Sequence, residues 1–151
     1  MTKSSDAKSA SRREDLTLFL DRSLGRDTVA SKLRDAGFEV EIHDNHFPPD
    51  SRDDQWLPVV GQRGWIVLTK DKNIRYRSAE LLAVVKGNAR VYTLVSGNMT
   101  ALQMADVFTK AVHHIEKSVR IYKPPYIAKI FSSGSVKIWV GRSELLKQFP
   151  I

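Results

Sequence analysis

Short apolar runs alternate with amphipathic segments along most of this chain, and this alternation limits what it can fold into. Apolar runs bounded by turn residues are typical of strands, and the segments between them have helical periodicity. We expect strands at residues 16–21, 38–42, 65–69 and 90–95, and a C-terminal β-hairpin at 126–131 and 135–140. We expect helices at 28–36, 53–64, 79–85 and 101–121, and a short last helix capped by Ser143. Strands that alternate with helices predict an α/β fold with a mostly parallel sheet.

The expected order of the strands predicts a topological switch point at one edge of this sheet. Right-handed crossovers between sequential neighbours place the first strand between the second and the third. The chain then winds in one direction on one side of the first strand and in the other direction beyond it. In open α/β sheets, ligands bind at such a switch point, outside the carboxyl ends of the strands.

Three carboxylates are expected at that point. Asp21 ends the first apolar run, Asp71 follows the third, and Asp53 begins the helix just before the third. Acids crowded in this way repel one another unless a cation is bound, and Mg²⁺ prefers oxygen ligands. With Mg²⁺ or Mn²⁺ in place, a water can be activated and a leaving oxygen stabilised, as phosphodiester hydrolysis requires.

Size and composition predict one domain in the cytoplasm. The chain has 151 residues, of which 42% are apolar, and it has no cysteine and no uninterrupted apolar run long enough to span a membrane. Its first residues are polar and lack the apolar segment of a secretory signal. We expect a disordered leader at 1–14 and a single domain at 15–151.

The net charge of +7 is unevenly distributed. Residues 1–60 have a net charge of −3, whereas residues 61–151 have a net charge of +10. An acidic centre beside a basic half suits a polyanion such as RNA. Many basic proteins bind nothing in particular through their charge, so composition alone leaves this open.

Several of these segments resemble a known family. FLDRSLG, DNHFPPDSRDDQWLPVVGQRGW and VLTKDKNIRYR resemble the PIN-like domain family of VapC-type toxin ribonucleases, and ARVYTLVSGNMT and PPYIAKIFSSGSVKIW resemble the ends of compact members. The resemblance covers about residues 16–140. It implies a three-layer α/β/α sandwich with a central, mostly parallel sheet, and acids that bind Mg²⁺ or Mn²⁺ to cleave RNA. It also implies an antitoxin protein as partner and a possible homodimer.

By position, Asp21, Asp53 and Asp71 match the acids of this family, as catalytic residues and metal ligands. The fourth acid of fuller PIN nucleases has no clear equivalent, although Asn98 stands near the expected place. That departure puts a second metal, and with it full catalysis, in question.

Basic residues near the acids are candidate ligands for the substrate phosphates: Arg22, Lys72, Arg75 and Arg77. The alternative is that the first two pair with neighbouring acids and that the last two belong to a solvated loop. Three other acids have structural interpretations. Glu80 can pair with the basic loop or add a ligand, and Asp54 can cap a helix. Asp44 can belong to a turn or support the three acids from outside their cluster.

The leading hypothesis is a metal-dependent endoribonuclease, the toxin of a toxin–antitoxin pair. The missing fourth acid motivates an alternative, a non-catalytic PIN-like module that binds nucleic acid or protein. An acid-cluster phosphatase acting on small substrates is a third possibility, which the basic C-terminal half makes less favourable.

Overall fold

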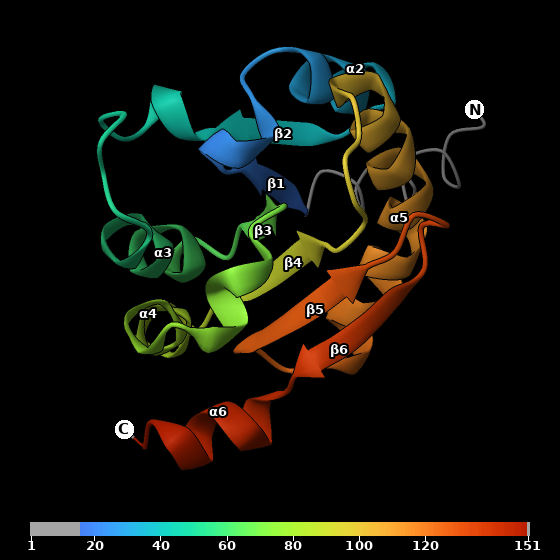
Figure 1. Cartoon of the computed structure of the whole chain (residues 1–151). Helices are drawn as coiled ribbons and strands as arrows, with labels where there is room; N and C mark the ends of the chain where they lie inside the picture. The colour runs from blue at the N-terminus through green and yellow to red at the C-terminus, as the bar shows by residue number, and fades with distance from the viewer. Residues whose placement is uncertain (1–15, 151) are drawn as a thin grey trace, which may run out of the picture.

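In the computed structural model, which describes residues 16–150, one six-stranded sheet has the order β2-β1-β3-β4-β5-β6. The strands are β1 (Thr17–Leu20), β2 (Glu39–Ile42), β3 (Ile66–Thr69), β4 (Arg90–Leu94), β5 (Tyr126–Ile130) and β6 (Val136–Val140). The first five run parallel, and β6 pairs antiparallel with β5 (Figure 1). The predicted parallel sheet and C-terminal hairpin are therefore confirmed, and the hairpin extends the main sheet.

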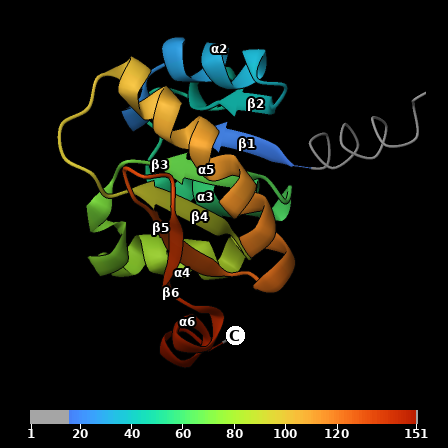
Figure 2. The same ribbon diagram turned by 90° about the vertical axis from the view of Figure 1, so that its right-hand side faces the viewer.

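Helices cover both faces of this sheet. They are α2 (Thr28–Asp35), α3 (Asp53–Gln62), α4 (Ser78–Gly87), α5 (Ala101–Ile121) and α6 (Arg142–Gln148). Figure 1 shows α2 and α5 on one face and α3 and α4 on the other, and in Figure 2 the long helix α5 crosses in front of the strands. The three-layer α/β/α sandwich is thus confirmed. None of the helices within residues 16–150 is long and apolar enough to cross a membrane.

The alternation of side chains along β1 explains why two hydrophobic cores form. Leu18 and Leu20 belong to the core beneath α2 and α5, whereas Phe19 belongs to the core beneath α3 and α4. All three are at most 1% exposed, as expected for a strand with helices on both of its faces. The edge strand β2 instead alternates, with Val40 and Ile42 buried between more accessible glutamates.

The predicted switch point lies between β1 and β3. Strand β1 pairs with β2 on one side and with β3 on the other, both in parallel register. Consequently Asp21, directly after β1, and Asp71, two residues after β3, leave neighbouring strands at the same edge of the sheet.

Two local expectations need correction, and a third concerns residues that the structure does not describe. Residues 72–77, expected to form a loop, contain the 3₁₀ helix η3 (Lys72–Tyr76), because the Asp71 carboxylate caps its first turn. The last helix begins at Arg142 with Gly141 as its N-cap, so the prediction that Ser143 caps it is wrong. The predicted leader at 1–14 lies outside the described residues.

Two glycines allow α3 and α4 to lie close together. A Cβ atom added at Gly61 would lie 2.5 Å from the carbonyl oxygen of Gly87, and one added at Gly87 would lie 2.8 Å from the Cα atom of Pro58. Both distances are too short for a side chain. The contact holds α3 against its neighbour, and α3 carries Asp53 at its first position.

We expect Gly61→Ala to lower the free energy of unfolding by about 1–3 kcal/mol, because overpacking outweighs the better helix propensity of alanine. Urea denaturation followed by circular dichroism measures this. Gly97→Ala is the matched control, since a Cβ atom there meets nothing within 4 Å. Equal free energies of unfolding for the two variants would contradict this account, because they would mean that α3 and α4 can move apart without an energetic cost.

Candidate active site

An open pocket of about 430 Å³ lies where β1 and β3 end. Its lining residues are Asp21, Arg22, Ser23, His43, Pro49, Ser51, Asp53, Trp56, Asp71 and Arg77. The structure therefore brings together all three acids selected from the sequence, although they come from three separate segments. Their catalytic and metal-binding roles remain predictions.

Asp21 is the most buried of the three acids, with 6% of its surface exposed. Its carboxylate caps the 3₁₀ helix η1 (Arg22–Leu24) by accepting the backbone N–H of Ser23 at 2.8 Å. The hydroxyls of Ser23 and Thr69 donate to it as well. Burial raises the pKa of Asp21 to about 6, and these hydrogen bonds to the carboxylate offset part of the rise.

Asp53 is the first residue of α3, where a carboxylate complements the helix dipole. The indole N–H of Trp56 donates to its Oδ1 atom at 3.2 Å. Burial raises the pKa of Asp53, and the negative charges of Asp71 and Glu80 raise it further. Asp53 in turn raises the pKa of Asp21, so the acids around the pocket repel one another.

Asp71 is neutralised by a guanidinium. Its Oδ1 atom accepts the backbone N–H of Asn73 at 2.9 Å, which starts η3. Arg77 donates to both carboxylate oxygens of Asp71, each at 2.9 Å, and to Glu80 at 2.7 Å. These hydrogen bonds with Asp71 and Glu80 raise the pKa of Arg77. Arg77 therefore joins two acids in a charge-assisted network at the wall of the pocket.

The other basic candidates lie in different places. Arg22 lines the pocket, but its Nε atom donates to Asp44 at 3.0 Å and its Nη1 atom donates to the carbonyl of Pro49 at 2.9 Å. Lys72 and Arg75 are not among the lining residues. The Arg75 guanidinium instead binds Glu144 of α6 at 3.0 Å.

Glu80 has the structural partner that its alternative implied, whereas Asp54 has a different one. Glu80 pairs with the basic segment through Arg77. Asp54 lies in the first turn of α3 and binds the Arg52 side chain at 3.1 Å. Arg52 is the N-cap of that helix, so the prediction that Asp54 caps it is wrong. Asn98 does not line the pocket.

Sequence reasoning missed three side chains that shape the pocket. Ser23 and Thr69 orient Asp21, and His43 is 2% exposed against the rings of Phe19 and Trp56. The spacing Asp-x-Ser is typical of an Asx turn and was a usable signal for Ser23. The position of His43 depends on packing between α3 and the sheet, which no local pattern encodes.

The donor set matches a hard divalent cation in its chemistry, because it consists of carboxylate oxygens that repel one another. Within residues 16–150, however, no three His, Asp or Glu side chains are grouped so that they could hold a metal ion. Each of the three carboxylates instead accepts a side-chain hydrogen bond, from Thr69 at Asp21, from Trp56 at Asp53 and from Arg77 at Asp71.

The raised pKa of Asp21 has a testable consequence for stability. Between the ordinary pKa of 3.8 and about 6, the folded protein binds more protons at Asp21 than the unfolded chain does. Its contribution to stability therefore falls as pH rises through this window and is fully unfavourable above it. In EDTA at pH 7, we expect Asp21→Asn to raise the free energy of unfolding by about 1–3 kcal/mol.

Urea denaturation from pH 4 to pH 7 checks this, and the advantage of Asp21→Asn should shrink as pH falls. Asp106→Asn makes the same exchange on the exposed surface of α5 and should leave stability unchanged. A loss of stability in Asp21→Asn at pH 7 would contradict the account, since it would mean that the buried charge is favourable without a cation.

Comparison with known proteins agrees with this arrangement. A family model described as a PIN like domain matches residues 16–96, which contain β1 to β4 and all three acids. A protein of Mycobacterium tuberculosis strain H37Rv named "Putative ribonuclease VapC45" is 30% identical over 125 residues, covering 80% of this chain and 90% of that protein. No solved structure matches the chain significantly. The chain therefore belongs to the PIN-like domain family, with a VapC-type protein among its relatives.

Proposed function

We propose that this protein is a metal-dependent endoribonuclease that hydrolyses RNA phosphodiester bonds as the toxin of a toxin–antitoxin pair. The observation that carries the proposal is the convergence of Asp21, Asp53 and Asp71 on one pocket at the switch point of the sheet. The similarity to a protein named as a ribonuclease supports the reaction class. The net charge of +10 in residues 61–151 supports a polyanionic substrate.

In this proposal, Asp21, Asp53 and Asp71 hold Mg²⁺ or Mn²⁺. When bound, the cation supplies an activated water and stabilises the leaving oxygen of the cleaved bond. The protein orients the ligands beforehand, since Ser23 and Thr69 fix Asp21 while Trp56 fixes Asp53. Cation binding would also offset the burial and the mutual repulsion that raise the pKa of Asp21 and Asp53.

In this proposal, Arg77 has a role both without a bound cation and with one. Its bidentate contact with Asp71 neutralises that carboxylate when no cation is present. Its contact with Glu80 gives it a second anchor, which would keep the guanidinium at the pocket wall if Asp71 held a cation. There it can bind a phosphate oxygen of the substrate, as an arginine does well.

The remaining basic candidates differ in distance from the reaction. Arg22 lies in the pocket wall, where it can contact the RNA backbone close to the cleaved bond. Lys72 and Arg75 lie outside the pocket, so we assign them to more distant phosphates of the RNA backbone.

An antitoxin protein is the partner that a VapC-type toxin requires, and we propose one here. We also propose a cytoplasmic location, and a homodimer remains a further prediction. Co-purification with the product of a neighbouring small reading frame would identify the antitoxin.

We expect Asp21→Asn, Asp53→Asn and Asp71→Asn each to reduce Mn²⁺-dependent cleavage of single-stranded RNA by at least about 100-fold, because each removes a charged ligand. Asp54→Asn is the control, since Asp54 neighbours Asp53 but, within residues 16–150, binds Arg52 alone. Cleavage of a labelled oligonucleotide should cease in EDTA and return with excess Mn²⁺. Undiminished cleavage by the three variants would reject this active site.

Two observations favour a second candidate, a PIN-like module that binds nucleic acid or protein without catalysis. Arg77 already neutralises Asp71, and residues 16–150 contain no group arranged to hold a metal. Pure wild-type protein that binds RNA but leaves it intact in Mn²⁺ would establish this alternative. Comparing cleavage of RNA with that of phosphomonoesters separates both candidates from a phosphatase.

A further inference from the structure

A second, smaller pocket of about 160 Å³ adjoins the pocket of the three acids. Its lining residues are Arg22, Gly25, Arg26, Ile42, His43 and Asp44. Arg22 and His43 also line the acid pocket, so the two cavities share a wall. None of the functions assigned above uses Arg26 or this cavity.

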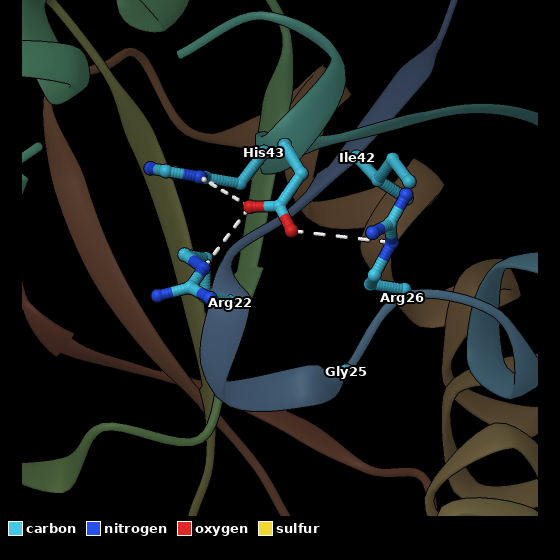
Figure 3. A pocket seen from close by; sticks show the side chains of 6 residues that line it. Arg22, Gly25, Arg26, Ile42 and His43 are labelled. Carbon is cyan, nitrogen blue, oxygen red and sulfur yellow. Dashed lines mark hydrogen bonds and ion pairs between the residues drawn. The ribbon is translucent and has the colours of Figure 1, made fainter. Parts of the chain in front are cut away.

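One carboxylate organises the second pocket. Arg22, Arg26 and His43 point toward it from different sides (Figure 3). This carboxylate belongs to Asp44. Its Oδ1 atom lies 3.0 Å from the Nε atom of Arg22 and 3.2 Å from the Nδ1 atom of His43. Its Oδ2 atom lies 3.9 Å from the Nε atom of Arg26. The hydrogen bond with His43 and the charges of the two arginines lower the pKa of Asp44, which therefore stays ionised.

Asp44 leaves most of the donors of the two arginines available. A guanidinium has five N–H donors, and both contacts to Asp44 use only the Nε atoms. Arg22 also donates to the carbonyl of Pro49, whereas Arg26 has no other partner within the described part of the chain. Their side chains are 52% and 66% exposed, so the remaining donors face solvent.

The charge of this pocket is opposite to that of its neighbour. Two guanidiniums face one carboxylate here, which leaves a net positive charge, while the adjoining pocket contains three acids. Gly25, with φ 81°, has a backbone conformation that side chains rarely adopt, and it turns the chain between Arg22 and Arg26 so that both can reach Asp44. Paired guanidiniums with free donors are well suited to an oxyanion such as phosphate.

We propose that this second pocket binds the backbone phosphate next to the one that is cleaved, with Arg22 and Arg26 as its ligands and Asp44 as the residue that positions them. The inference rests on the proposed ribonuclease function and extends it, because it sets how the RNA strand runs from the acid pocket toward β2. Because the two pockets share Arg22 and His43, a strand of linked phosphates suits the pair better than a single small phosphate does. Arg26 is then a binding residue for substrate rather than a catalytic one.

The test measures RNA binding without hydrolysis. Binding of a labelled single-stranded RNA decamer is followed by fluorescence anisotropy in EDTA, over a series of salt concentrations. Each phosphate contact contributes about −0.7 to the slope of log affinity against log salt for single strands. We expect Arg26→Ala to lose about 0.7 of that slope and to bind about fivefold more weakly at 0.1 M salt.

Arg120→Ala is the matched control, because it removes the same charge from an exposed residue near the last turn of α5, away from both pockets. We expect it to keep the wild-type slope. An unchanged slope in Arg26→Ala, or an equal loss in both variants, would overturn the proposed phosphate site.

Asp44→Asn separates positioning from simple charge. Removing a negative charge should strengthen RNA binding if Asp44 merely lies nearby. If Asp44 positions Arg22 and Arg26, the variant should bind RNA more weakly than wild type despite its extra positive charge, and tighter binding would refute the positioning role. Melting curves confirm that the variants are folded.

The readout also distinguishes this inference from the proposed function. Should wild-type protein bind RNA with the predicted Arg26 contribution yet fail to cleave it in Mn²⁺, the second pocket stands and the ribonuclease proposal fails. In active protein, Arg26→Ala should raise KM about fivefold and leave kcat unchanged, whereas a fall in kcat alone would contradict a binding role.

Discussion

The hydrogen bond from the Thr69 hydroxyl to the Asp21 carboxylate joins the carboxyl ends of β1 and β3, and the site depends on it. Other contacts close the same junction: the Asp21 N–H donates to the carbonyl of Leu68 at 3.2 Å, and the Lys70 N–H donates to the Ser23 hydroxyl oxygen at 3.2 Å. The Asp71 N–H also donates to Thr69 Oγ1, at 3.0 Å. The two turns that carry Asp21 and Asp71 are therefore held to each other, and the position of one fixes that of the other.

This junction has an energetic cost, which a bound cation would offset. Asp21 is buried with a raised pKa, and hydrogen bonds alone do not fully offset the loss of hydration. Asp53 adds repulsion from α3. Without a cation, a neutral side chain at position 21 would be more stable, whereas a binding site for a cation benefits from carboxylates that are held in place before the cation arrives.

The sequence predicted the parts of this arrangement that depend on local pattern and topology. The apolar runs ending at Asp21 and preceding Asp71 identified adjacent buried strands, and right-handed crossovers then placed their ends together. Contacts made by long side chains could not be predicted in this way. Arg77 reaches Asp71 because η3 folds the chain back. Arg75 binds Glu144, which lies 69 residues further along the chain, in α6.

The two adjoining pockets at this edge of the sheet carry opposite charges. Acids gather at the ends of β1 and β3, and beyond β1 the arginines around Asp44 form a positive neighbour. Such a pattern suits the proposed RNA substrate, with one phosphate at the acids and the next at the arginines. In that proposal, the arginines supply the positive charge that the acidic first part of the chain lacks overall.

The central claim is that the three acids form one binding site for a divalent cation, and calorimetric titration with Mn²⁺ tests it most directly. Wild-type protein should bind Mn²⁺ saturably, and Asp53→Asn should weaken that binding at least about tenfold, because one of its three charged ligands is lost. Asp54→Asn should bind as wild type does. Equal Mn²⁺ affinity in wild type and Asp53→Asn, or no Mn²⁺ binding by wild type at all, would contradict the account.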